Sequence, residues 1–229
     1  FQQTCLALRM APIPVVTAAS GLSLGGGFEV VLHTDKAIYH ANSVSGLVES
    51  LVGVVPGGGG VKEMVYRWSA QLDDATKGAW QAFMNVGYGK TARSPLEAKE
   101  MCLFRDGTDE YLMNRDRLLD AAMTAAEDLA PGYLPAGCEP IPAAGRGACD
   151  EMVAWLEKAR DKGHLTPHDV TTGSQVAMIV TGGDVEAGAL VSEQDLYDLE
   201  RKAFVTLCRT DETRARIEHM LTYGSALRN

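Results

Sequence analysis

Short apolar runs separated by glycine turns fill the first part of the chain, and they predict a layer of short strands and helices. Residues 14–19, PVVTAA, form a β-rich run between a proline and a Ser-Gly turn, so we expect a buried strand there. Residues 22–24 continue as a brief extended piece into three glycines, and 26–33 has the pattern of a buried helix. KAIYHA, residues 36–41, predicts a second short strand.

From residue 61 onward, apolar positions recur at helical spacing over most of the chain. Helices are predicted over 61–70, 73–84, 95–103, 113–129, 148–162, 174–181 and 192–222. A strand–helix–strand unit followed by a long helical half predicts an α/β layer capped by helices.

Two segments bear on how the chain is divided. PGYLPAGCEPIPAAGRG, residues 131–147, is rich in proline and glycine and predicts a linker or a long surface loop. The opening FQQTCLALRM has apolar side chains near one face, as in an amphipathic helix, and Phe1 is not an initiator methionine. With no signal peptide at the start, we expect the sequence to be a piece of a longer chain.

Composition excludes several classes of partner. The formal net charge of -9 argues against a nucleic acid or an anionic membrane, because a phosphate backbone must meet a basic surface. No apolar run approaches the roughly 18 to 20 residues of a membrane span. The five cysteines are odd in number and show no CxxC spacing, which indicates reduced thiols in a cytoplasmic protein.

The glycine run Gly25–Gly27 precedes a predicted helix, and this arrangement has two interpretations. A helix leaves its first N–H groups unpaired, and glycine lets a ligand oxygen approach them closely. The run is therefore a candidate site for a carbonyl oxygen that gains negative charge during a reaction. The alternative is a tight turn with no ligand.

Two acids stand in apolar surroundings near these glycines. Glu29 lies among phenylalanine, valine and leucine, where an unpaired carboxylate is costly to bury. A glutamate near a helix N-terminus is also simply favourable. Glu49 is a second acid in an apolar stretch, and alone it is as well explained as a residue at the rim of the core. Together, two acids beside a cluster of glycine N–H groups fit water addition or proton transfer.

Other motifs favour no cofactor chemistry. PGGGGVKE, residues 56–63, lacks the GxxxxGK[ST] pattern of a phosphate loop and predicts a plain loop that leads into a helix. No GxGxxG fingerprint follows a strand, which argues against a nicotinamide site in this piece. His164 and His168 are separated by Pro167, so a helical pair of metal ligands is not expected.

The stretch from PVVTAASGLSLGGGFEVVLHTD to LVGVVPGGGG resembles the crotonase (enoyl-CoA hydratase/isomerase) family. By this resemblance, Gly26 supplies half of an oxyanion hole for a thioester carbonyl, and Glu29 and Glu49 hold and activate water. Gly25, Gly27, Pro56 and Gly57 are then the expected substrate-binding positions.

The tail carries the resemblance further. SPLEAKEM and LYDLERKAFVTLCRTDETRARIEHML are similar to the family's later segments, and RIEHMLTYGSALRN is closest to bacterial multifunctional fatty-acid oxidation proteins. We therefore expect a crotonase-like ββα spiral core over 1–130, a helical insertion over 131–191, and C-terminal helices over 192–229. The family's first half, which supplies the other oxyanion N–H, is expected to precede Phe1.

The resemblance implies an enoyl-CoA hydratase in fatty-acid β-oxidation, fused to a 3-hydroxyacyl-CoA dehydrogenase. Acyl-CoA is then the substrate, no cofactor is expected in this region, and NAD belongs only to the fused dehydrogenase part. The family also implies a homo-oligomer or a thiolase partner. Two alternatives stay open: a double-bond isomerase, which needs Glu49 alone, and a non-catalytic assembly region of the dehydrogenase.

Overall fold

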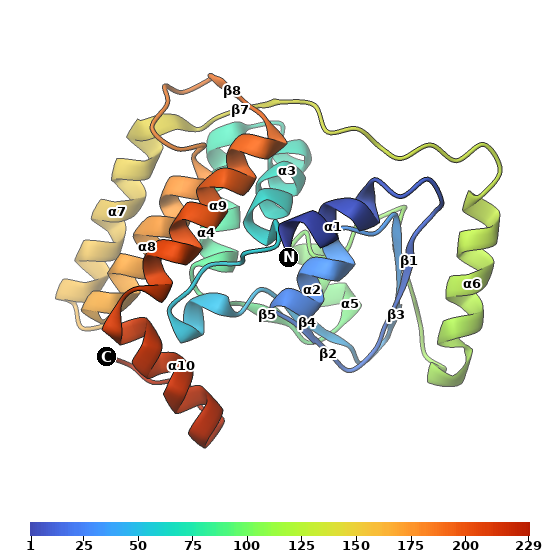
Figure 1. Ribbon diagram of the computed structural model, residues 1–229, viewed down its shortest axis with the longest axis horizontal. Helices are drawn as coiled ribbons and strands as arrows, with labels where there is room; N and C mark the ends of the chain where they lie inside the picture. The colour runs from blue at the N-terminus through green and yellow to red at the C-terminus, as the bar shows by residue number, and fades with distance from the viewer.

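The computed structural model describes all 229 residues and divides visibly into an α/β part and a group of helices (Figure 1). The α/β part contains α1 (Gln2–Arg9), β1 (Val16–Ala19), β2 (Leu22–Leu24), α2 (Gly26–Leu32), β3 (Lys36–His40), β4 (Val44–Gly46), the 3₁₀ turn η1 (Glu49–Val52), β5 (Thr91–Ala92), α5 (Pro95–Glu100), β6 (Glu110–Leu112), the 3₁₀ turn η2 (Arg115–Arg117) and α6 (Leu118–Leu129). The helical part contains α3 (Gly60–Leu72), α4 (Ala75–Val86), β7 (Ile141–Pro142), α7 (Gly145–Asp161), α8 (Pro167–Val180), β8 (Leu190–Val191), α9 (Glu193–Cys208) and α10 (Asp211–Tyr223). The predicted α/β layer capped by helices is thereby confirmed.

Three small sheets organise the strands. β1, β3 and β6 form a parallel sheet in the order β1-β3-β6, in which Thr17 pairs with Ala37. β2 pairs in parallel with β4, which pairs antiparallel with β5. β7 and β8 form an antiparallel pair. β1 is followed by β2, and β2 leads directly into α2. The glycine turn therefore lies where the chain leaves the second sheet.

One core connects the α/β part with most of the helices. A cluster of 32 buried apolar residues includes Phe28 of α2, Met64 of α3, Phe83 of α4 and Met152 of α7. By contrast, α6 packs on the far side of the β1–β3–β6 sheet through Leu118, and it stands apart from the other helices (Figure 1). The proposed division into 1–130, 131–191 and 192–229 stays a prediction, although α7 and α8 share the core of the first segment.

Several predicted boundaries are wrong, each for an identifiable reason. The stretch 192–222 is two helices, because Thr210 accepts the Thr213 N–H at 3.3 Å and begins α10 as a new cap. The stretch 174–181 belongs to a helix that begins at Pro167, where Thr166 and Asp169 form a capping box. A proline in the first turn thus starts this helix and does not interrupt it.

Besides the two-residue strands β5, β7 and β8, the longer strands β4 and β6 were not predicted. β6 and η2 occupy 110–117, so the helix expected over 113–129 begins only at Leu118. Both strands are three residues long, and pairing with β2 and β3 defines them. Measured by length and hydropathy, no helix in the chain qualifies as a membrane span. The proline- and glycine-rich segment after α6 runs as a long connection across the molecule to α7 (Figure 1).

Candidate active site

The glycine turn that opens α2 has a backbone shape that side chains disfavour. Gly25 is the N-cap of α2 with φ +56° and ψ −133°, and its N–H donates to the Gly46 carbonyl at 2.9 Å. Gly26 and Gly27 form the first turn of the helix, where N–H groups have no intrahelical acceptor. A Cβ on Gly27 would meet nothing within 4 Å, so this side of the turn is open.

Glu29 lies one turn along α2 and is held by the glycine loop between η1 and α3. Glu29 is 1% exposed, and its Oε1 atom accepts the N–H groups of Gly58 and Gly60, both at 2.7 Å. Burial raises the pKa of Glu29 above its usual value, while these amide bonds and the charge of Lys62 lower it in part. The carboxyl group is thus desolvated and anchored at the same time.

Unlike Glu29, Glu49 receives no hydrogen bond at its carboxyl group. It is the first residue of η1, and both of its carboxyl oxygens are buried with no hydrogen-bond partner. Burial, followed by the charge of Glu29, raises its pKa to about 8. The Oε1 atom lies 3.3 Å from the position a Cβ would take on Gly25, so this carboxyl group adjoins the glycine turn. The structure therefore brings Gly25, Gly26, Glu29 and Glu49 together, as the spacing of the motif predicted.

The remaining predicted substrate-binding positions lie at the edge of this group. Pro56 is buried next to Gly60, and Gly57 faces the Phe204 ring of α9 at 3.2 Å from its Cβ position. Their role in binding stays a prediction. The ring of Phe1 lies 3.4 Å from the Cβ position of Gly26 and also adjoins Gly58, so it covers the site in this structure.

A buried polar network, which the sequence analysis did not identify, lies beneath Glu29. His33 approaches the Glu29 carbonyl through Nδ1 at 2.7 Å and approaches Tyr197 and Lys62 through Nε2 at 3.0 and 3.2 Å. Because a carbonyl only accepts, Nδ1 carries the hydrogen in this arrangement. Burial is the main cause that lowers the pKa of His33 to about 4, so its ring is neutral near pH 7.

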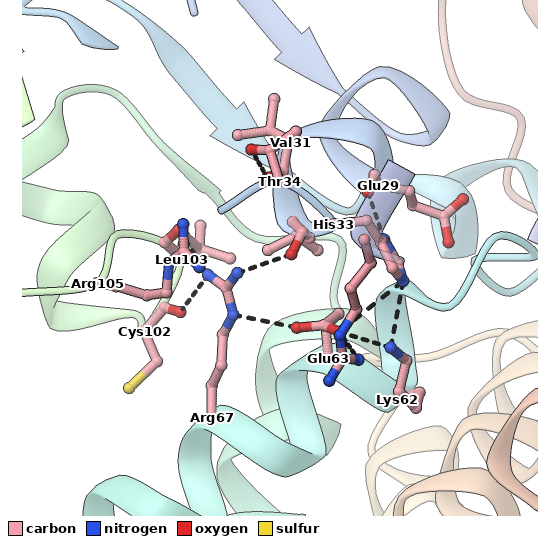
Figure 2. A network of polar contacts seen from close by, with 12 residues as sticks. Glu29, Val31, His33, Thr34, Lys62, Glu63, Arg67, Cys102, Leu103 and Arg105 are labelled. Atoms are coloured by element: carbon pink, nitrogen blue, oxygen red, sulfur yellow. Dashed lines mark hydrogen bonds and ion pairs between the residues drawn. The ribbon is translucent and has the colours of Figure 1, made fainter. Parts of the chain in front are cut away.

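Charged groups complete this network, which Figure 2 shows from close by. The Lys62 ammonium, fully buried, contacts Glu63 at 2.5 Å and Glu193 at 2.7 Å, and Arg9 of α1 reaches the same two carboxylates. Burial is the largest single effect and opposes ionisation of both Lys62 and Glu63. Their attraction to each other and to further charged neighbours together outweighs it, which holds the pKa of Lys62 high and that of Glu63 low. The network joins α1, α2, α3 and α9 around the backbone of Glu29.

The turn that carries Glu49 is held by helices from the later part of the chain. Thr213 of α10 donates its hydroxyl hydrogen to the Gly53 carbonyl at 2.6 Å, just after η1, and His168 of α8 lies 2.8 Å from the same hydroxyl. Arg216 is buried and pairs with Asp169 at 2.8 Å. Helices α8 and α10 therefore hold the turn that carries Glu49.

Glu200 is a further acid near the site. It belongs to α9, is fully buried and accepts the Lys62 N–H at 2.7 Å. The sequence did contain a signal, because Glu200 falls at helical spacing among Leu196, Tyr197 and Ala203, on the buried face of its helix. Elsewhere, no group of three or more His, Cys, Asp and Glu side chains is placed to hold a metal ion, and all five cysteines are free thiols.

Two acids beside a helix-opening glycine turn are able to perform acid–base chemistry on a carbonyl compound whose oxygen the turn binds. Residues 1–71 match the family described as enoyl-CoA hydratase/isomerase. The fold agrees: an enoyl-CoA hydratase from Mycobacterium avium is 18% identical with a TM-score of 0.54, covering 98% of this chain and 66% of its own. A carnitinyl-CoA hydratase from the same organism is 17% identical with a TM-score of 0.54, covering 93% and 62%.

A curated relative extends the sequence match to the whole chain. The "Probable 3-hydroxyacyl-CoA dehydrogenase" of Bacillus subtilis (strain 168) is 34% identical over 230 residues, covering 100% of this chain. The chain spans only 29% of that relative's length. The resemblance to the crotonase superfamily is thus confirmed, and the chain has the fold of its enoyl-CoA hydratases.

Proposed function

We propose that this region catalyses the reversible addition of water to a trans-2-enoyl-CoA, which yields a 3-hydroxyacyl-CoA. The observation that carries the proposal is the juxtaposition of two unlike carboxyl groups at one glycine turn. Glu29 is anchored by two amides, and Glu49 is buried with no partner for either oxygen. A hydratase needs such a pair, since one group must take a proton while the other gives one.

The proposed mechanism uses three groups of this chain. The Gly26 N–H donates to the thioester oxygen and polarises the conjugated double bond, so that C3 becomes electrophilic. Glu29 accepts a proton from a water molecule that adds to C3. Glu49, protonated near pH 7 by virtue of its raised pKa, delivers a proton to C2. The hydroxyl group of water is thus added to C3 and a proton to C2. Glu29 ends protonated and Glu49 ionised, and transfer of one proton from Glu29 to Glu49 restores the starting state.

The name of the curated relative supports a wider proposal. We infer that the parent protein also carries a 3-hydroxyacyl-CoA dehydrogenase, which would oxidise the product of hydration with NAD bound outside this region. The two reactions follow each other in fatty-acid β-oxidation. A cytoplasmic location, and association with further copies or with a thiolase, belong to the same proposal.

The test is turnover of crotonyl-CoA by the full-length protein and its variants. Glu29→Gln and Glu49→Gln each lower kcat by about 10²- to 10⁴-fold, the usual contribution of a general acid or base. Glu127→Gln on the exposed face of α6 is the matched control and keeps wild-type kcat. Hydration that survives both site substitutions contradicts the proposal.

A double-bond isomerase is the second candidate, and Glu49 specifically favours it. A carboxyl group with a pKa of about 8 can both take and return a proton near neutral pH, which is all that isomerisation requires. The discriminating measurement compares 2-enoyl with 3-enoyl thioesters. An isomerase would act on 3-enoyl-CoA, lose this activity in Glu49→Gln and retain it in Glu29→Gln. If neither substitution alters turnover of either thioester, the region is an assembly region.

A further inference from the structure

The glycine loop before α3 is held by two carboxyl groups that come from different elements. Glu29 of α2 accepts the N–H groups of Gly58 and Gly60. Glu200 of α9 accepts the N–H of Lys62, which lies 138 positions earlier in the chain. Alternate amides of one short backbone segment thus bind the two acids, so the position of one carboxyl group depends on the other.

The start of α3 explains why the loop needs an acceptor from outside. Its N-cap is Gly59, with φ +110°, and glycine has no side chain to accept the N–H groups of the first turn. A serine, threonine, aspartate or asparagine at the N-cap usually performs this task. Glu200 supplies the missing acceptor to Lys62, the third residue of the helix, and Glu29 supplies it to Gly60, the first.

Stability alone does not explain a glutamate at this position. Glu200 is 0% exposed, and its Oε2 atom has no hydrogen-bond partner. A buried oxygen without a partner destabilises the fold, and it persists where the group has another task. Leu196 and Ala203 on the same face of α9 show that apolar side chains fit there.

We propose that Glu200 is a positioning residue for Glu29: by holding the Lys62 amide from the α9 side, it fixes the loop whose Gly58 and Gly60 amides bind Glu29. The inference rests on the hydratase function proposed above. It adds to that function an acid more than 150 residues away from the catalytic glycine turn. The consequence is that α9 takes part in setting the protonation of Glu29.

Charged and titratable groups from three further elements lie near the two carboxyl groups. Lys62 comes from α3, Glu49 from η1, and the Cys5 thiol from α1, while Glu29 and Glu200 also act on each other electrostatically. Burial first, and then the charge of Glu29, raise the pKa of Glu200 well above its usual value. The charge of Glu29 therefore opposes ionisation of Glu200.

The test uses the full-length protein and the pH dependence of crotonyl-CoA hydration. Glu200→Leu removes the acceptor, and Glu200→Asp retracts it by one methylene. Both lower kcat by about 10- to 100-fold through misplacement of Glu29, with KM nearly unchanged. Both also move the acid limb of kcat/KM to higher pH by about one unit, because looser amide bonds stabilise ionised Glu29 less.

Glu200→Gln keeps a carbonyl oxygen for the Lys62 N–H and restores most of the activity and the acid limb. Asp198→Asn, an exposed carboxylate on the same helix, is the matched control with wild-type behaviour. If thermal melting shows that the leucine variant does not fold, the kcat values and pH profiles of the aspartate and glutamine variants test the inference.

Unchanged pH profiles in both Asp and Leu variants overturn the inference, as does a glutamine variant as impaired as the leucine one. Glu29→Gln, measured in parallel, separates this failure from failure of the proposed function. If Glu29→Gln is inactive while the Glu200 variants behave as wild type, only the role of Glu200 is wrong. If Glu29→Gln is fully active, the hydratase proposal itself is wrong.

Discussion

Glu29 and Glu49 are carboxyl groups beside the same glycine turn, yet the surrounding chain treats them in different ways. Glu29 accepts two backbone amides from a loop whose helix, α3, adds partial positive charge at its N-terminus. The oxygens of Glu49 accept nothing and are out of contact with solvent. A polar cradle favours the ionised form, and apolar burial favours the protonated form. The difference assigns the base and the acid of the proposed reaction.

The two supports also come from different regions. The loop under Glu29 is held by α9 and by the network around Lys62, whereas the turn that carries Glu49 is held by α8 and α10. Substitutions in one support should therefore act on one acid first.

The largest contrast is expected from replacing each acid by leucine. Glu29→Leu leaves the buried amides of Gly58 and Gly60 without an acceptor, and we expect a loss of about 2–5 kcal/mol in the free energy of unfolding. Glu49→Leu removes a carboxyl group that has no partner, and we expect a neutral or stabilising effect. Urea unfolding of the full-length variants measures both. Equal losses in the two variants would contradict the contrast.

The second prediction concerns the pH dependence of stability. The pKa of Glu49 is raised to about 8 in the folded state, so between about pH 5 and pH 8 the folded state binds a proton that the unfolded state has released. The free energy of unfolding then falls with rising pH, by up to about 1.4 kcal/mol per unit for this group. Glu49→Gln should abolish this contribution. In urea titrations, the free energy of unfolding of the variant minus that of the wild type should rise steadily with pH across this range.

Glu29→Gln provides the comparison for that titration. Its amide bonds partly offset the effect of burial, so its substitution should alter the slope less than Glu49→Gln does. If Glu29→Gln changes the pH slope of the free energy of unfolding more than Glu49→Gln does, the assignment of acid and base is reversed.

The third prediction tests the turn between the acids. Gly25→Ala places a side chain at φ +56° and brings a Cβ to 3.3 Å from Glu49 Oε1. Backbone strain of this kind costs about 1–3 kcal/mol, and the displaced carboxyl group should lower hydratase kcat as well. Gly147→Ala in α7, where a Cβ meets nothing within 4 Å, is the matched control. Equal effects on melting temperature and kcat at the two positions would refute a special role of Gly25.

The smallest effect is expected at the support of Glu49. Thr213→Val keeps the shape of the side chain but leaves the Gly53 carbonyl without its donor, at a cost of about 1–2 kcal/mol. Thr222→Val, whose hydroxyl donates to its own helix on the exposed part of α10, is the control. A melting temperature that drops equally in both variants would show that the contact with Gly53 adds nothing specific.

Local pattern accounts for much of the fold and for the members of the site. The strand over 14–19, the helix after the glycines and the loop PGGGGVKE leading into a helix all follow from neighbouring residues. The glycine turn and its two acids were identified in the same way, because Glu29 and Glu49 stand out in apolar stretches. Their catalytic roles remain predictions.

Features that depend on pairing between distant segments were missed. β6 exists because Ile38 and Tyr39 of β3 offer it hydrogen bonds, and residues 110–112 by themselves contain no strong strand signal. Glu200 stands in a charged helical run, and its spacing from Leu196 and Ala203 indicates the buried face of its helix. Only the packing of α9 against α3 brings its carboxyl group to the Lys62 amide.

The sequence by itself determined most of the helices, the first strands, the glycine turn and the identity of its acids, because dihedral preference, hydrophobic period and residue chemistry are local properties. Only the tertiary structure decided which acid is anchored and which is unpartnered. It also decided that a carboxyl group from α9 shares the loop with Glu29. A carboxyl group's pKa depends on its desolvation and on the donors that reach it, and both are supplied by segments far away in the chain.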